Sequence, residues 1–489
     1  MSKKYKVTIG MEIHVELKTN SKMFCRCKNE LGLEKEPNEN ICEICTAQPG
    51  TLPVPNKKAV EFVQLAGLAL NCRLRKNSKF DRKNYFYPDI PKGYQISQYD
   101  QPLCENGNMK IGTRKIGITR IHLEEDTGKL THPKGVNYSL VDFNRAGVPL
   151  MELVTEPDFE NGEEARIFCQ KLQQVCRYLE ISDADMEKGQ MRCEANVSLY
   201  EEGKDRLSGT KVEVKNINSF KFVEKAINYE IQRQAELLNK GEKIIQETRG
   251  WDANHGKTLS QRSKETAADY RYFPEPDIPP MKFSDEYIKE LEMKLPELPD
   301  KKRERFLQEY DLKKDEVDLL INEKEMADYF EQVVSEIKEK IKAKEIKSSE
   351  TKVIKLAVNY FNTELRKHLL DSRQKIGDIK ITAENYAELM GIVADGEINS
   401  SAAQTVLLEM YETGGDPSQI IAEKNLAQMN DEADLEKLIL EILKENPESV
   451  ADYKKGKDNA LKFLMGQVMK KTQGKANPQL AMEILKSKI

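Results

Sequence analysis

The segment Tyr5-Lys-Val-Thr-Ile-Gly-Met-Glu-Ile-His-Val-Glu-Leu-Lys18 alternates strictly: its odd positions are apolar, and its even positions are polar or glycine. A period of two predicts a β-strand with one buried face and one polar face. Glu12, His14 and Glu16 share the polar face, at intervals of about 7 Å along the strand. We therefore expect the fold to be organised around this strand, with its polar face as the functional surface.

A second segment, Thr119–Gly128, contributes His122, Glu124, Glu125 and Asp126. Carboxylates and imidazole on a sheet are the groups that a hard divalent cation and an anionic substrate require. Alternation places Glu124, not Glu125, on the face of His122. The choice between the two glutamates depends on where the strand ends, so both remain candidates.

Length and composition narrow the class of protein. A chain of 489 residues predicts about three domains. With 33% charged residues and no apolar run near the roughly 20 residues of a membrane span, it is not a membrane protein. The chain enters its first strand almost at once, which leaves no room for a signal peptide and favours the cytoplasm. The net charge of −5 means that nucleic-acid binding requires a local basic patch.

Four of the nine cysteines, Cys25, Cys27, Cys42 and Cys45, form two close pairs in sequence typical of a loop. Four thiolates in two pairs predict a tetrahedral structural zinc site over residues 25–45. The first pair is C-x-C rather than the commoner C-x-x-C, and the alternative is a set of ordinary reduced cysteines. Disulfides are the less favoured interpretation inside a cell.

Several other segments carry candidate binding residues. Residues 78–100 interleave Lys, Arg and Tyr with Pro88, Pro91 and Gly93, which indicates either a nucleotide or RNA contact or a loop packed over the sheet. Glu152 lies inside an apolar run, where an unpaired carboxylate is costly, so it is expected to face a cation or a site. Charged residues also alternate over 191–199 and 211–215.

Helical spacing and capping residues predict helices over Lys57–Leu70, Glu163–Tyr178 and Ser219–Lys240. From Met293 the composition shifts to Lys, Glu and Leu, as in a helical domain. Between Lys454 and the end, nine lysines face two acids, a local charge of +7. Such a surface is typical of a polyanion site, although a lysine-rich tail is often only solubilising.

The chain closely resembles the B subunits of bacterial aspartyl/glutamyl-tRNA amidotransferases, essentially from end to end. The one departure is Glu194, where aspartate is expected; some members lack the four cysteines. The resemblance rests on these motifs: Gly10-Met-Glu-Ile-His14, the cysteine pairs, Lys79-Phe-Asp-Arg-Lys-Asn-Tyr-Phe-Tyr-Pro88, Gln95-Ile-Ser-Gln98, His122-Leu-Glu-Glu-Asp126, Asn144-Arg-Ala-Gly147, Lys215-Asn-Ile-Asn-Ser-Phe220, Asp269-Tyr-Arg-Tyr-Phe-Pro-Glu-Pro276, Gly466-Gln-Val-Met469 and Ala476-Asn-Pro478.

The resemblance implies an α+β fold: a mainly antiparallel cradle domain with a glutamine-synthetase-like catalytic fold over residues 1–293, a helical domain over 294–405 and a tRNA-binding tail over 406–489. It implies an ATP-dependent carbon–nitrogen ligase with glutamine as amido donor. An amidase-type A subunit and a small C subunit would be its partners. The B subunit would use ATP and Mg²⁺ to phosphorylate the side-chain carboxyl of misacylated Glu-tRNA(Gln) or Asp-tRNA(Asn), and ammonia would then give Gln-tRNA(Gln) or Asn-tRNA(Asn).

The residues fit this chemistry, because phosphoryl transfer to a carboxylate gathers negative charges that a metal must neutralise. We expect the Mg²⁺ ligands to be Glu12, His14, Glu125 and Glu152, with Glu124 as the alternative to Glu125. Arg145, Arg192 and Lys211 are candidates for stabilising the transferred phosphate.

Two other functions remain open from the sequence. A non-catalytic, zinc-stabilised tRNA-binding scaffold predicts no convergence of acids on one point. A metallohydrolase using His14 and His122 is weaker, because the histidines are few and are not spaced as H-x-x-H.

Overall fold

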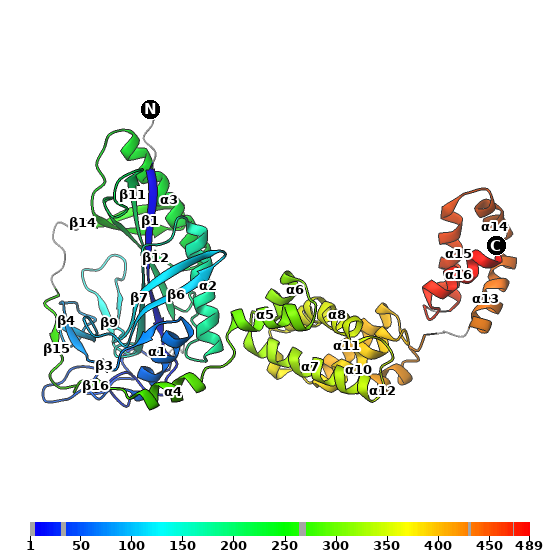
Figure 1. The fold of residues 1–489 in the computed structure, drawn as a ribbon, viewed down its shortest axis with the longest axis horizontal. Helices are drawn as coiled ribbons and strands as arrows, with labels where there is room; N and C mark the ends of the chain where they lie inside the picture. Colours follow the sequence, from blue (N-terminus) through cyan, green and yellow to red (C-terminus); the bar gives the residue numbers. More distant parts are fainter. Residues whose placement is uncertain (1–4, 31–35, 264–269, 429–431, 473) are drawn as a thin grey trace. The chain divides into compact units, whose positions relative to one another are not determined.

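The computed structural model describes residues 5–30, 36–263, 270–428, 432–472 and 474–489. The chain divides into two compact units, Met1–Pro299 and Asp300–Ile489, and each is considered by itself. The first unit combines a large sheet with helices, and the described part of the second contains helices only (Figure 1). The architecture is therefore mixed α/β with an all-helical C-terminal region, as expected.

Strand β1 (Tyr5–Glu16) lies in the middle of a nine-stranded sheet, so the predicted strand is confirmed. It pairs antiparallel with β10 (Pro149–Thr155) on one side and β11 (Met191–Glu201) on the other. Among the described pairings, β12 with β13 is parallel and the rest are antiparallel. The order across the sheet is β14 (Lys257–Ser263), β13 (Glu247–Asp252), β12 (Val212–Ile217), β11, β1, β10, β7 (Arg114–Glu125), β6 (Cys104–Ile111) and β2 (Arg73–Leu74).

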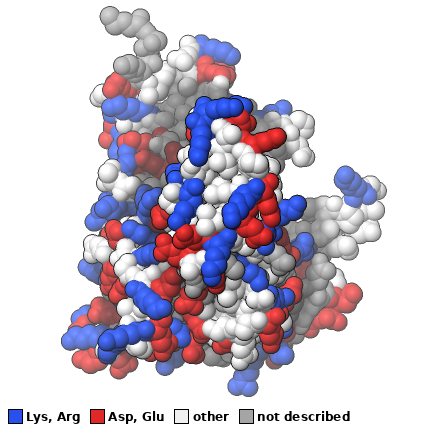
Figure 2. Space-filling view, turned by 90° about the vertical axis from the view of Figure 1, so that its right-hand side faces the viewer, with Lys and Arg blue, Asp and Glu red and all other residues white. Residues whose placement is uncertain are grey.

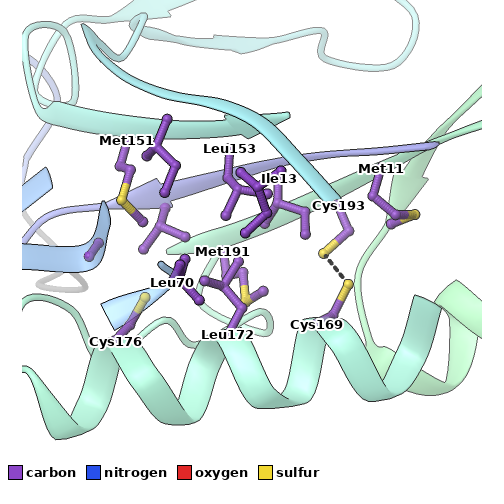
Figure 3. Close-up of a cluster of buried hydrophobic side chains, with 14 of the residues drawn as sticks. Met11, Ile13, Leu70, Met151, Leu153, Cys169, Leu172, Cys176, Met191 and Cys193 are labelled. Atoms are coloured by element: carbon purple, nitrogen blue, oxygen red, sulfur yellow. Dashed lines mark hydrogen bonds between the residues drawn. The ribbon is translucent and has the colours of Figure 1, made fainter. Parts of the chain in front are cut away.

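The apolar face of this sheet packs on helices. Helix α2 (Gly162–Tyr178) brings Leu172 beneath Ile13 and Leu153 of the central strands (Figure 3). All three are fully buried, and burying such a side chain contributes about 1.5–3 kcal/mol. Helices α1 (Lys57–Ala69), α3 (Phe220–Asn239) and α4 (Asp285–Met293) complete the helical part of this unit. The helices cover one face of the sheet, and the polar side chains lie on the opposite face.

The predicted helix starts are confirmed by their caps. The Asn56 side chain accepts hydrogen bonds from the backbone N–H groups of Lys58 and Ala59 at the start of α1. The Ser219 hydroxyl accepts one from the N–H of Phe222 at the start of α3. These bonds satisfy donors that have no partner within the helix.

Short strands lie outside the main sheet. Residues 78–100, whose sequence indicates either a binding segment or a loop packed over the sheet, contain β4 (Asp81–Asn84) and β5 (Tyr94–Ser97). These two strands form a small sheet with β15 (Phe273–Pro274). The remaining pairs are β3 (Asn77–Ser78) with β16 (Met281–Lys282) and β8 (Lys129–Thr131) with β9 (Leu140–Asp142).

The second unit contains two separate hydrophobic cores. One extends from Phe306 to Ile421, and the other begins at Leu435. The expected boundary at 405/406 falls inside α11, whose Val406 and Met410 belong to the first of these cores. Its elements are α5 (Pro299–Glu309), α6 (Lys314–Leu320), α7 (Lys324–Lys342), α8 (Glu350–Tyr360), the π-turn η1 (Phe361–Leu365), α9 (Arg366–Ser372), the 3₁₀ turn η2 (Ile376–Asp378), α10 (Ala383–Ala394), α11 (Ser400–Thr413), α12 (Pro417–Glu423), α13 (Glu432–Glu445), α14 (Pro447–Lys454), α15 (Asp458–Lys471) and α16 (Pro478–Lys488).

Within the described residues, no helix combines the length and apolarity that crossing a membrane requires.

Candidate active site

The register of the three central strands brings the candidate carboxylates and histidines together. His14 on β1 lies opposite Glu152 on β10, and Glu152 lies opposite His122 on β7. Directly paired residues on one face of a sheet have neighbouring side chains. Glu12 and Glu124 are displaced by two residues on the same strands, so they share this face.

The distances within this carboxylate–histidine cluster are those of a shared site. His14 Nε2 lies 3.4 Å from Glu152 Oε2 and 3.6 Å from Glu124 Oε1. One ligand atom each from Glu12, His14 and Glu152 lies within 4.8 Å of the others, and the same is true of His122, Glu124 and Glu152. Oxygen atoms with one imidazole nitrogen at this spacing suit a small divalent cation.

The electrostatics of the cluster favour positive charge at its centre. Burial and the charge of Glu152 raise the pKa of Glu12. Burial opposes the charge on His14, but the hydrogen bond to Glu152 and the surrounding carboxylates outweigh it and raise the pKa of His14 to about 9. Burial likewise disfavours ionised Glu152, yet His122 and His14 bring its pKa well below the usual range. The cluster therefore fits a cation.

Glu125 is not part of this cluster. Successive strand residues point to opposite faces, and the Glu125 carboxylate instead lies 2.6 Å from Lys92 Nζ and accepts a 3.0 Å hydrogen bond from the Ile96 N–H. Together with Cys25 and Cys45 it lines a separate cavity of about 260 Å³. Of the two glutamates left open by the sequence, the structure brings Glu124 to the other candidates.

A polar cavity of about 560 Å³ opens over the carboxylate–histidine cluster. Arg192 and Lys211, two of the three predicted phosphate-binding residues, line it. Arg145 is not among the lining residues; it donates hydrogen bonds to the backbone oxygens of Thr127 and Gly128. The cavity thus places cationic side chains beside the carboxylate–histidine cluster, an arrangement that transfer of a phosphoryl group would use.

The sequence did not single out several residues of this cavity. Lys83 lines it, and its ammonium lies 5.2 Å from the centre of the Tyr270 ring. Burial opposes its charge, but Glu124 and Glu152 raise the pKa of Lys83. The other additions are Tyr85, Tyr99, Tyr272, Arg120, Lys215 and Glu213. Lys83, Tyr85 and Tyr99 lie in the mixture of basic and aromatic residues over 78–100, and Glu213 and Lys215 lie in the alternating segment 211–215.

Asp126 balances the charge of two arginines beside the cavity. Its Oδ2 accepts a 2.6 Å hydrogen bond from Arg192 and lies 3.6 Å from Arg145 Nε. Burial opposes ionisation, but the two guanidinium groups lower the pKa of Asp126. Arg145 thus reaches the site through Asp126, not by lining the cavity.

The four clustered cysteines converge in a way that fits one metal ion. The Sγ atoms of Cys25, Cys27, Cys42 and Cys45 lie within 4.8 Å of one another. The Sγ atoms of Cys42 and Cys45 are 3.9 Å apart, and a tetrahedral zinc–thiolate site requires about 3.8 Å. The hydrogen bond from Cys25 and the nearby Lys22 ammonium help lower the pKa of Cys45 to about 5. A thiolate is therefore favoured at Cys45, whereas the hydrogen bond with Cys45 raises the pKa of Cys25 and burial raises the pKa of Cys27.

The lysine-rich end of the chain folds together with acidic residues that precede it. Over residues 432–489, eleven lysines face nine acids, which leaves +2 rather than the +7 counted from Lys454 onward. Lys471 lies 3.1 Å from both Glu441 and Glu445, and Lys488 pairs with Glu436. Figure 2 shows basic and acidic side chains interspersed on the face that it presents. The charge excess of the C-terminal helices is smaller than the tail segment alone indicated.

The fold and the site define a class: a sheet-based protein whose buried carboxylate–histidine cluster opens into a cation-lined cavity. Family models match residues 7–289 as a GatB/GatE catalytic domain and residues 328–489 as a GatB domain. The chain therefore belongs to the GatB/GatE family, in agreement with the resemblance carried by its sequence motifs.

Curated relatives match over almost their whole length. Three of them are each named as the B subunit of an aspartyl/glutamyl-tRNA(Asn/Gln) amidotransferase. That of Caldanaerobacter subterraneus subsp. tengcongensis is 48% identical, with 99% of both chains covered. That of Brevibacillus brevis is 47% identical over the same shares, and that of Thermotoga petrophila is 46% identical over 99% of this chain and 98% of the relative.

Proposed function

We propose that this chain is the ATP-using subunit of a tRNA-dependent amidotransferase. It phosphorylates the side-chain carboxyl of misacylated Glu-tRNA(Gln) or Asp-tRNA(Asn), and ammonia converts the product to Gln-tRNA(Gln) or Asn-tRNA(Asn). The observation that carries the proposal is the convergence of Glu12, His14, Glu124 and Glu152 beneath a cavity lined by cations. The names of the relatives supply the substrate.

The first step transfers the γ-phosphoryl group of ATP to the substrate carboxylate, which forms an acyl phosphate and releases ADP. Glu12, His14, Glu124 and Glu152 would hold Mg²⁺, which would supply positive charge against the phosphate oxygens. In this proposal Glu124, rather than Glu125, is the fourth Mg²⁺ ligand. Arg192 and Lys211 stabilise charge on the transferred group from the wall of the cavity, and Arg145 keeps Asp126 in place beside Arg192.

The second step joins nitrogen to carbon. Ammonia attacks the acyl carbon, a proton is lost, and the C–O bond to phosphate breaks, so the products are the amide and inorganic phosphate. Glu124 and Glu152 are 1% and 4% exposed, so the reaction would take place over the buried floor of the cavity. Glutamine would be the amido donor, hydrolysed on an amidase-type A subunit, with a small C subunit completing the complex.

The remaining features fit a cytoplasmic ligase of this kind. Structural zinc would sit in the four-cysteine cluster, where its binding energy fixes the loop that carries it. The large, mainly antiparallel sheet would form a cradle related to the glutamine synthetase catalytic fold. The C-terminal helices would contact tRNA away from its aminoacyl end.

The test measures amidation by reconstituted complexes in which one glutamate of this chain is replaced by glutamine. Glu124→Gln and Glu152→Gln should each lower ATP-dependent amidation of Glu-tRNA(Gln) by about 10²-fold or more, because they remove groups aligned on the charge that develops. Glutaminase activity should persist. Exposed Glu187 supplies the matched control, Glu187→Gln. Near-normal amidation in both Glu124→Gln and Glu152→Gln would overturn the site.

The scaffold alternative predicts that acids do not gather at one point. The distances within the carboxylate–histidine cluster therefore favour the enzyme. A scaffold would also leave amidation unchanged in both variants.

A further inference from the structure

The second unit contains a cavity that the proposed reaction does not use. It has a volume of about 370 Å³ and lies where α9 meets the end of α6 and the start of α7. The size is in the range of pockets that hold small molecules. Its lining residues are Leu319, Asn322, Glu323, Met326, Arg366, Leu369, Leu370, Arg373, Gln374, Lys375 and Ile376. We refer to it as the α9 cavity.

The α9 cavity combines an apolar floor with a basic rim. Residues 366–375 include four basic residues and one acid, in a chain whose net charge is −5. Arg373 and Lys375 are exposed, and no ion pair engages them within the described residues. Leu370 is 69% exposed beside these cations. The surface therefore offers apolar contact and positive charge to the same ligand.

Two observations, one in the cavity wall and one in the helical turn that precedes it, point to a bound group. The Nη1 atom of Arg366 is buried, yet it has no hydrogen-bond partner among the described residues. A buried donor left unpaired is unfavourable, and a hydrogen bond to a ligand atom would satisfy it. The preceding turn, Phe361–Leu365, is a π-helix, a local insertion that is often found at functional sites.

We propose that the α9 cavity binds an unstacked nucleotide from a loop of the tRNA. RNA-binding proteins read such nucleotides by apolar or planar contact with the base and by cations on the phosphates. Here Leu369 and Leu370 contact the base, the Arg366 guanidinium bonds its edge, and Arg373 and Lys375 hold adjacent phosphates. The inference rests on the proposed function, which supplies tRNA as the substrate.

The experiment measures binding of an unmodified tRNA(Gln) transcript to the full-length chain over a range of salt concentrations. The variant Arg373→Gln with Lys375→Gln should weaken binding by about tenfold or more and flatten the log–log salt slope by about 1.4–1.8, the value for two phosphate contacts. The matched control, Lys342→Gln with Lys347→Gln, removes the same charge from exposed lysines of the same unit. It should change affinity by less than about twofold.

A further variant distinguishes the apolar contact with the base from the ionic contacts with the phosphates. Leu370→Ala should weaken binding about threefold and leave the salt slope unchanged, because it removes apolar contact but no charge. Leu370 is largely exposed, so this change leaves the helical core intact. Circular dichroism of each variant confirms the fold.

Several outcomes would overturn the inference. Equal losses in the two double variants would mean that the cations act only through overall charge. If Arg373→Gln with Lys375→Gln bound tRNA as tightly as the wild type, the RNA contact would be excluded. If this variant kept its tRNA affinity but no longer associated with the partner subunits, the cavity would be a protein-docking surface. Failure of the wild-type complex to amidate Glu-tRNA(Gln) at saturating tRNA would instead refute the proposed function.

Discussion

Replacement of Asp126 tests the charge balance that supports the cavity. Asp126 is 5% exposed and accepts the 2.6 Å hydrogen bond from Arg192. Removing one partner of a buried pair costs about 3–5 kcal/mol, but the Arg192 side chain is 35% exposed, so solvent screens part of the loss. We expect Asp126→Asn to lower the free energy of unfolding of the first unit by about 2 kcal/mol.

Glu16→Gln is the variant to compare with Asp126→Asn, because the Glu16 carboxyl group lies beside the Asp126 carboxylate. Burial and the charge of Asp126 raise the pKa of Glu16 to about 8. Glutamine resembles the protonated form, so this change should alter stability by less than about 1 kcal/mol below pH 4.5 and should raise the free energy of unfolding at neutral pH. The folded pKa exceeds the unfolded value of 4.5, so the wild-type protein should lose stability as pH rises between the two, by at most about 1.4 kcal/mol per pH unit.

Urea unfolding followed by tryptophan fluorescence measures both effects. Trp251 is the only tryptophan of the chain and is buried in the first unit, so its signal reports that unit. The free energy of unfolding is measured at several pH values, with chelator present so that bound metal does not contribute. As pH rises, this free energy should increase for Glu16→Gln relative to wild type. The reasoning would be refuted if Glu16→Gln destabilised the unit as much as Asp126→Asn at neutral pH.

Three further predictions concern the zinc cluster, the core and the C-terminal helices. Cys42→Ser should abolish stoichiometric zinc by elemental analysis, and wild-type protein without zinc would contradict the assignment. Leu172→Ala should destabilise the first unit by about 2–5 kcal/mol in the same urea assay; a loss below about 1 kcal/mol would contradict the packing. Lys462→Gln with Lys470→Gln should flatten the salt dependence of tRNA binding by about 1.4–1.8, with ATP hydrolysis unchanged, whereas an unchanged slope would identify these lysines as solubilising surface.

The period-two pattern of Tyr5–Lys18 was sufficient to predict β1 and the face on which Glu12 and His14 lie. Capping residues were sufficient to predict the starts of α1 and α3. Both signals are local: alternation follows from strand geometry, and a cap satisfies the first N–H groups of its own helix. Four cysteines in two pairs likewise predicted the cluster that the structure assembles.

What could not be predicted depends on the register between strands distant in the chain. The pairing of His14 with Glu152, and of Glu152 with His122, decides that Glu124 joins the cluster and Glu125 does not. The aromatic wall of the cavity arises because β4 and β5 form a separate small sheet with β15. The charge of the C-terminal helices was overestimated because Glu441 and Glu445 precede the segment that was counted.

The most direct test of the central claim follows oxygen from the substrate carboxyl. Misacylated Glu-tRNA(Gln) carrying ¹⁸O in both oxygens of its side-chain carboxylate is converted by the reconstituted complex with ATP and glutamine. If this chain directs phosphoryl transfer to the carboxylate, one ¹⁸O atom appears in inorganic phosphate for each amide formed, and Glu124→Gln abolishes both together. Amide formation with no ¹⁸O in phosphate would contradict the account.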